Sequence, residues 1–351
     1  MPGGNESALT DISHLGEFGL IDRITQNFPR LYPDVIKGVG DDAAVIRSGN
    51  GKVQVISTDL LLEGVHFDLA YVPLRHLGYK AVAVNVSDIT AMNIKPYGVT
   101  VSIAISNRFP VEAVDELYEG IRLACEKYQV DLLGGDTASS RQGLVISVTA
   151  VGEGMENQVV YRSGAKPRDL ICVSGDVGGA YAGLLVLDRE KSVYLQAPDT
   201  QPDLNDYDYV IGRQLKPEAR LDILVRLAEL GVRPTSMIDV SDGIASEINH
   251  LCRQSKTGAT IFAGKLPFDY QTLKVAEEFS LSPVTFAMNG GEDYELIFTV
   301  PIQDFDKIKA ERNFTIIGHM TDDPNVIQIV LDSGEAVDIE AQGWNHFKSN
   351  T

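Results

Sequence analysis

Short runs of β-branched and apolar residues alternate with longer amphipathic runs along the first half of the chain. The short runs have apolar residues at every second position, and the longer ones have the three- to four-residue spacing of helices. The strand-like runs are residues 52–58, 98–105 and 144–154, and the helical runs are residues 73–93 and 110–129, the second opened by Pro110. This alternation predicts an α/β domain over residues 1–157.

The same alternation restarts in the second half of the chain. A turn at residues 162–169 precedes the strand-like LICVSG, a glycine-rich bend and a helix, and another helix is expected at residues 218–230. Residues 189–216 are polar and predict a surface excursion. Further strands are expected at residues 295–300, 314–320 and 326–332. Because 351 residues exceed the size at which one core usually stops growing, we expect a second α/β domain over residues 158–351.

The charge balance limits the partners of the chain. It has 30 basic and 49 acidic residues and a net charge of -19, which opposes binding to nucleic acid or to an anionic membrane. A phosphate ligand would therefore need metal ions or a few well-placed basic groups. The N-terminus lacks a signal-peptide pattern and no run of about 18 apolar residues occurs, so a cytoplasmic protein is expected. Cys125, Cys172 and Cys252 are scattered, as is typical of core residues in a reducing compartment.

Acidic residues lie at or near the ends of several apolar runs, beside Gly, Ser or Thr. They are Asp41 and Asp42 in GVGDDAAVI, Asp59, Asp88 in NVSD, Asp136 in LLGGDT, Asp239 and Asp242 in MIDVSDG, and Glu292 and Asp293 in NGGEDYELIF. Taken singly, each could be structural, as a helix N-cap (Asp88 or Asp242) or in a solvated turn (Asp59 or Asp136). Because ligands gather at the carboxyl ends of strands in open α/β sheets, the acids together predict one carboxylate cluster. Oxygen ligands alone favour Mg²⁺ before Ca²⁺, and not zinc.

Other types of site find less support. No Walker A pattern occurs, and GVGDDA matches the dinucleotide pattern G-x-G-x-x-A but is followed by a strand-like run instead of a helix. The serines have no G-x-S-x-G context and the histidines no H-E-x-x-H pattern. The sequence GDVGGAYAG could place backbone N–H groups around a phosphate at a helix start, and a tight turn that needs glycine explains it equally well.

Eight segments occur in an order that is typical of one enzyme family. They are GEFGLIDRI, GVGDDAAVI, STDLLLEGVHFD, NVSDITAMN, LLGGDT, RSGAKPRD, IDVSDGIASEI and NGGEDYELIFTV. In this combination the chain resembles the thiamine-monophosphate kinase family, of the aminoimidazole-ribonucleotide-synthetase-like superfamily, from GEFGL to GWNHF near the C-terminus. Sister families include selenophosphate synthetase and the hydrogenase maturation dehydratase, but this N-terminus lacks the reactive Cys or selenocysteine usual in the first.

The resemblance implies ATP- and Mg²⁺-dependent phosphorylation of thiamine monophosphate to thiamine diphosphate by direct in-line transfer. It implies a two-domain α/β fold, with an N-terminal domain that forms a barrel-like sheet in a homodimer and a C-terminal α/β domain that closes over ATP and substrate. Several Mg²⁺ ions would be held by Asp42, Ser57, Thr58, Asp59, Asp88, Asp136, Asp239 and Asp242. ATP would be contacted by Tyr118, Gly135, Asp136, Arg162 and Ser241, and thiamine monophosphate by His66, Glu292 and Trp344.

Physical chemistry agrees with this implied reaction. Two phosphorylated substrates can enter an acidic protein only with cations that neutralise their charge. The acceptor oxygen is already ionised, so no catalytic residue is expected as a general base. Asn93 stands where the family usually has Gly, and Asn tolerates the left-handed backbone that such a turn needs. A sister-family ATP-dependent enzyme with another acceptor, or a phosphate-binding homologue without turnover, remains an alternative.

Overall fold

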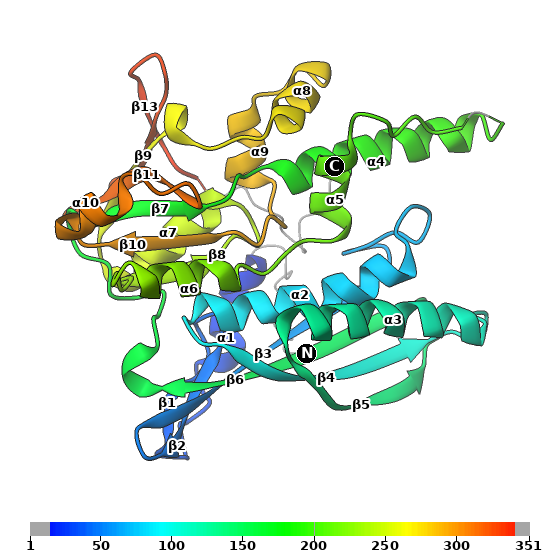
Figure 1. Ribbon diagram of the computed structural model, residues 1–351, viewed down its shortest axis with the longest axis horizontal. Coiled ribbons are helices and arrows are strands. Elements are labelled where there is room, and N and C mark those ends of the chain that lie inside the picture. Colours follow the sequence, from blue (N-terminus) through cyan, green and yellow to red (C-terminus); the bar gives the residue numbers. More distant parts are fainter. Residues whose placement is uncertain (1–14, 200, 341–351) are drawn as a thin grey trace, which may run out of the picture.

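The computed structural model describes residues 15–199 and 201–340, which form two β-sheets with helices between and around them (Figure 1). The first sheet has the order β1-β2-β3-β6-β4-β5. Its strands are β1 (Val35–Lys37), β2 (Ala44–Gly49), β3 (Lys52–Leu62), β6 (Val145–Met155), β4 (Pro96–Ile105) and β5 (Asp131–Ser139). Only β4 and β5 pair in parallel. Within one chain this sheet is open, with β1 and β5 at its edges, so the expected barrel-like sheet would need the second copy of a homodimer.

Helices α2 (Leu74–Ala91) and α3 (Val111–Tyr128) cover one face of the first sheet (Figure 1). Their backbones touch, because a Cβ at Gly78 would lie 2.0 Å from the carbonyl oxygen of Leu117. Helix α2 is buried along most of its length from Leu77 onward, since it also contacts β8 and α5 of the second half of the chain. It therefore lies between the two layers, and α1 (Gly16–Thr25) precedes the sheet.

The second half of the chain forms a sheet of seven strands with the order β13-β12-β9-β11-β7-β10-β8. The strands are β7 (Leu170–Ser174), β8 (Ser236–Asp239), β9 (Gly258–Phe262), β10 (Leu296–Val300), β11 (Phe314–Thr321), β12 (Ile327–Val330) and β13 (Ala336–Asp338). The helices are α4 (Gly179–Gln196), α5 (Asp208–Leu215), α6 (Leu221–Glu229), α7 (Ile244–Ser255), α8 (Tyr270–Glu278), α9 (Pro283–Asn289) and α10 (Phe305–Ile308). No helix of the described residues has the length and apolar character needed to cross a bilayer. Of the four buried clusters among the described residues, one lies mainly in the first layer and three lie mainly in the second, as a two-domain α/β fold requires.

The predicted excursion at residues 189–216 is wrong in part. Helix α4 continues to Gln196, and α5 occupies Asp208–Leu215. The two helices pack closely, because a Cβ at Gly183 would lie 2.1 Å from the carbonyl oxygen of Val210, which is fully buried. The polar residues in this segment made the helical pattern of α5 unrecognisable in the sequence.

Asn93 has the left-handed backbone expected of it. Its φ is +57°, and it follows Met92, the C-cap of α2. Its side-chain Nδ2 donates a hydrogen bond to the carbonyl oxygen of Gln158 at 2.9 Å. The turn that leads from α2 to β4 is thus kept without glycine.

Candidate active site

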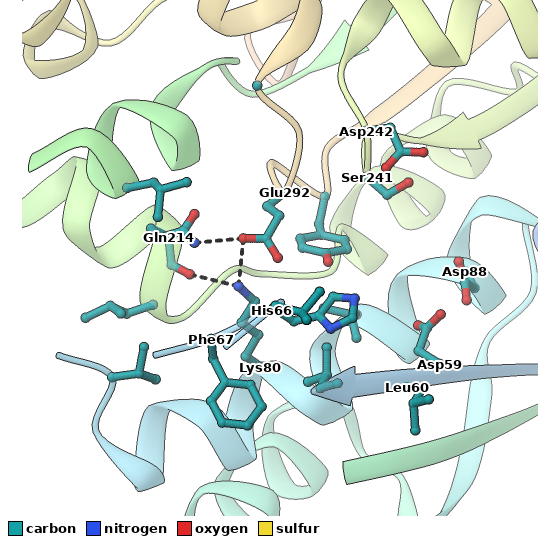
Figure 2. Close-up of a pocket in the computed structure, with 18 of the residues that line it drawn as sticks. Asp59, Leu60, His66, Phe67, Lys80, Asp88, Gln214, Ser241, Asp242 and Glu292 are labelled. Atoms are coloured by element: carbon teal, nitrogen blue, oxygen red, sulfur yellow. Dashed lines mark hydrogen bonds and ion pairs between the residues drawn. The ribbon is translucent and has the colours of Figure 1, made fainter. Parts of the chain in front are cut away.

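A cavity of about 570 Å³ is lined by residues from both halves of the chain. Its walls come from β3, the loop after β3 and α2 on one side, and from α5, α7 and the loops around β8 and β10 on the other. Figure 2 shows two ends of this cavity. Asp59, Asp88 and Asp242 lie at one end, and Lys80 and Glu292 lie at the other. The cavity can therefore receive an elongated ligand with chemically different ends.

Three aspartates from distant segments converge at the acidic end. Asp42 precedes β2, Asp88 belongs to α2 and Asp239 ends β8, and one oxygen from each lies within 4.8 Å of the others. The Ser57 hydroxyl donates to Asp88, and the Ser87 hydroxyl donates to Asp239 Oδ2 at 2.5 Å. These hydrogen bonds fix the carboxylates as a group, the arrangement that a hard cation requires.

Burial makes these carboxyl groups difficult to ionise together. It raises the pKa of Asp42 to about 7, and those of Asp59 and Asp239 to about 6. The pKa of Asp88 rises well above its usual value because of burial and the charges of Asp59, Asp239 and Asp42. Asp42 Oδ2 is buried and takes no hydrogen bond from the described residues. An all-oxygen donor set with an unused buried oxygen fits a divalent cation.

The adjacent aspartates Asp41 and Asp42 have different roles. Asp41 Oδ1 accepts the backbone N–H of Arg162 at 3.0 Å, and Asp41 Oδ2 lies 3.1 Å from Lys37 Nζ. Asp42 faces the cluster, where its Oδ1 accepts a hydrogen bond from Arg162 Nη2 at 2.7 Å. Asp41 thus anchors the segment, while Asp42 and Arg162 present charged groups to the cavity.

A carboxylate and an ammonium group pair at the other end of the cavity. Glu292 Oε2 lies 2.9 Å from Lys80 Nζ and accepts a hydrogen bond from Gln214 Nε2 at 2.7 Å (Figure 2). His66 also lines the cavity, and its Nδ1 accepts the backbone N–H of Leu62 at 3.0 Å. In the neutral ring, the proton is therefore on Nε2.

Comparison with known proteins identifies the family. Residues 40–153 match the family described as AIR synthase related protein, N-terminal domain. Thiamine-monophosphate kinase of Bacillus subtilis is 34% identical over 95% of this chain and 100% of its own length. Thiamine-monophosphate kinase of Escherichia coli K12 is 35% identical over 95% of this chain and 98% of its own length. The chain belongs to the thiamine-monophosphate kinase family.

Solved structures agree with this membership of the thiamine-monophosphate kinase family. A structure described as AaThiL complexed with AMPPCP and TMP superposes with a TM-score of 0.82 at 32% identity, covering 97% of this chain and all of that one. Thiamine monophosphate kinase from Aquifex aeolicus gives a TM-score of 0.74 at 30% identity, over 93% of this chain and 99% of that one. Hydrogenase maturation protein HypE, at 16% identity and a TM-score of 0.66, shares the fold.

Most of the residues predicted for a kinase site of this family line the cavity or its cluster. They are Asp42, Ser57, Thr58, Asp59, His66, Asp88, Arg162, Asp239, Ser241, Asp242 and Glu292. Tyr118 lies on α3, and Gly135 and Asp136 lie on β5, which β6 and β4 separate from β3. These three are not among the residues that line the cavity within one chain. Trp344 lies outside the described residues.

Four polar or charged residues stand out among the cavity-lining residues that sequence reasoning missed. Glu247 and His250 lie on α7, Lys80 lies on α2 and Gln214 lies on α5. Glu247 is 2% exposed and accepts the backbone N–H of Asp242 at 3.0 Å, and burial followed by the charge of Asp242 raises its pKa well above the usual value. The sequence feature that could have identified Lys80 and Glu247 is a charged residue inside an otherwise apolar helical run, in GYKAVAV and in IASEINHL.

The glycine-rich bend GDVGGAYAG is occupied by a side chain of the protein itself. Asp293 Oδ2 accepts the backbone N–H of Gly178 at 2.6 Å, and Oδ1 accepts that of Ala180 at 3.2 Å. Asp293 is only 1% exposed. These donors at the start of α4 are therefore used inside the fold, which favours the structural explanation of the bend over a phosphate site.

Proposed function

We propose that this chain transfers the γ-phosphoryl group of ATP to the phosphate of thiamine monophosphate, giving thiamine diphosphate and ADP. The observation that carries the proposal is the cavity with a buried aspartate cluster at one end and Glu292 at the other. Membership of the thiamine-monophosphate kinase family supports both substrates, since a relative is described in complex with AMPPCP and TMP. A sister-family activity is less well supported, because the HypE likeness is limited to the fold.

The proposed cofactor is Mg²⁺, held by Asp42, Asp88 and Asp239 and by further oxygens around them. Those further ligands are Asp59 and Asp242, the hydroxyls of Ser57 and Thr58, and Asp136. When bound, Mg²⁺ would neutralise phosphate charge and favour in-line transfer. Arg162 and Ser241, together with Tyr118 and Gly135, would orient ATP. Arg162 is suited to this role because Asp42 fixes its guanidinium beside the cluster.

The acceptor oxygen needs no general base in this reaction. A phosphate monoester presents an ionised oxygen, whereas an alcohol must lose a proton during transfer. The carboxylate of Glu292 is engaged by Lys80, and Nδ1 of His66 is engaged by the backbone of Leu62. Catalysis then depends on positioning and charge neutralisation by the residues around the aspartate cluster. His66, Glu292 and Trp344 would contact the thiamine part.

We expect thiamine monophosphate to be phosphorylated and free thiamine to be left unchanged. The aspartate-bound metal ions can bind the phosphate of the monophosphate, and free thiamine offers them no comparable group. Loss of this anchor removes several kcal/mol of positioning energy. The test is ADP release at saturating ATP and Mg²⁺ with each acceptor, with Mg²⁺ omitted as a control. Comparable rates for the two acceptors would refute the mechanism and the proposed substrate.

We also propose that the protein is a homodimer through the first sheet. The edge strand β5 is exposed at all nine residues, and Leu132 and Leu133 are 48% and 52% exposed. A long apolar edge strand requires a cover. Asp136 and Gly135 lie on this strand, so their proposed contacts with metal and ATP depend on the partner copy.

The dimer has a direct test in sedimentation velocity at micromolar concentration. We expect the wild type to sediment as a dimer and Leu132→Glu to shift it toward a monomer, because a charge would be buried in the contact. Val225→Glu on α6, where the side chain is 60% exposed, is the matched control and should remain dimeric. A monomeric wild type would contradict the proposal.

We propose that the chain divides near residues 157 and 158 into an N-terminal metal-binding domain and a C-terminal domain that closes over the substrates. The two sheets lie on either side of this point in the sequence. We place the enzyme in the cytoplasm, where ATP is available. Its three cysteines are free thiols, which a reducing compartment maintains.

A further inference from the structure

Lys80 is a buried cation in the wall of the cavity. Its side chain is 3% exposed, and its Nζ lies 2.9 Å from Glu292 Oε2 and 3.3 Å from the carbonyl oxygen of Gln214. A buried ammonium group requires an anionic or strongly polar partner, and Glu292 supplies the anion. Because α2 belongs to the first layer and Glu292 precedes β10 in the second, this pair joins the layers at the cavity (Figure 2).

Glu292 is held from several directions. Its Oε2 receives Lys80 Nζ and Gln214 Nε2, and its backbone N–H donates to the carbonyl oxygen of Ser241 at 2.7 Å. Its φ is +58°, a left-handed backbone that a non-glycine residue adopts only when its surroundings impose it. The side chain keeps 26% exposure toward the cavity, and Oε1 takes no hydrogen bond from the described residues. Oε2 of Glu292 is thus held by Lys80 and Gln214, while Oε1 remains available to a ligand in the cavity.

Helix α2 sets the distance between the two ends of the cavity. Lys80 and Asp88 are separated by two turns of this helix, which corresponds to about 12 Å along its axis. A metal-bound phosphate at Asp88 would place the other end of an extended acceptor near Lys80 and Glu292. That end of thiamine monophosphate carries ring nitrogens and an amino group, which can donate a hydrogen bond to a carboxylate.

We infer that Lys80, together with Gln214, is a positioning residue that fixes Glu292 so that Glu292 Oε1 accepts a hydrogen bond from the nitrogen-bearing rings of the acceptor. This inference rests on the proposed function. Lys80 also balances the charge of Glu292, so this carboxylate does not compete with the aspartate cluster for cations. Lys80 acts through Glu292 and makes no contact with the transferred phosphoryl group.

The test is steady-state kinetics of Lys80→Met, Glu292→Gln and the double variant, with ATP and thiamine monophosphate varied separately. Lys80→Met should raise the KM for thiamine monophosphate roughly 10- to 100-fold and leave the KM for ATP unchanged. In the Glu292→Gln background, Lys80→Met should have little further effect, because the two residues act as one unit. Lys216→Met is the matched control: its side chain is 43% exposed, pairs with Glu218 at 3.7 Å and lies outside the cavity lining.

Gln214→Leu provides a second variant in case Lys80→Met folds poorly. Gln214 Nε2 reaches the same oxygen of Glu292, and Gln214 Oε1 is buried without a partner among the described residues, so leucine leaves no side-chain donor without its acceptor. It should also raise the KM for thiamine monophosphate selectively. Unchanged KM values in folded Lys80→Met or Gln214→Leu, multiplicative effects in the double variant, or an equal rise in the KM for ATP would overturn the inference. A wild type that does not phosphorylate thiamine monophosphate would instead refute the proposed function.

Discussion

Asp88→Asn is expected to lower turnover about a thousandfold while leaving the fold intact. Asp88 lies at the centre of the cluster, where the charges of Asp59, Asp239 and Asp42 all act on it. Asparagine keeps the shape and an oxygen that can accept from the Ser57 hydroxyl, but it removes the charge that a cation needs. The measurement is ADP release over a range of Mg²⁺ concentrations, and extra Mg²⁺ should restore little of the activity.

The same substitution should not destabilise the metal-free protein. Burial and neighbouring like charges oppose ionisation of Asp88, so a permanently neutral side chain avoids the cost of a buried charge at this position. In EDTA, the melting temperature of Asp88→Asn should equal or exceed that of the wild type. With Mg²⁺ and ATP added, the wild type should gain more stability than the variant, because ligands stabilise only the state that binds them.

Companion variants determine whether the acids act as one unit. Asp42→Asn and Asp242→Asn should also lower turnover severely, and combinations should cost far less than the product of the single effects. Asp41→Asn is the contrast, since Asp41 contacts Lys37 and the backbone of Arg162 and is not one of the three clustered aspartates. It should lower the melting temperature more than the turnover. Normal activity in any two of the Asp42, Asp88 and Asp242 variants would exclude a shared metal site.

The sequence predicted the strands and helices well where one periodicity persisted over many residues. The run at residues 52–58 lies in β3, and the helical run at residues 73–93 contains α2. The expected carboxylate cluster is present in Asp42, Asp88 and Asp239, but the strand-end argument for it holds only for Asp239, because Asp88 lies within α2 and Asp42 precedes β2. Asp239 ends β8, and Ser87 of α2 contacts it across 152 positions of the sequence.

Pairing between side chains could not be predicted in the same way. Nothing local distinguishes Asp41 from Asp42, and only their tertiary partners show that one anchors the segment and the other faces the cluster. Lys80 lies 212 positions before Glu292. In the sequence, nothing distinguishes Lys80 from any other charged residue on α2. Lys80 is buried because the second layer of the fold covers α2, and this burial cannot be predicted from the helical spacing.

Asp293→Ala is expected to reduce the free energy of unfolding by about 3 kcal/mol, although Asp293 is not among the residues that line the cavity. The carboxylate accepts the backbone N–H groups of Gly178 and Ala180 at the start of α4, and Arg213 Nη2 lies 3.6 Å from its Oδ1. Alanine leaves two buried donors without acceptors and removes one of the anions around a buried guanidinium. The midpoint of urea denaturation measures the loss.

An ordinary helix N-cap provides the control for the loss of unfolding free energy expected in Asp293→Ala. Asp269 caps α8 by accepting the backbone N–H of Gln271 at 2.7 Å, and it lies in a less buried position than Asp293. Asp269→Ala should therefore cost about 1 kcal/mol. If Asp293→Ala cost no more than Asp269→Ala, the N–H groups of GDVGGAYAG would not depend on Asp293. The phosphate-binding explanation of that bend would then have to be considered again.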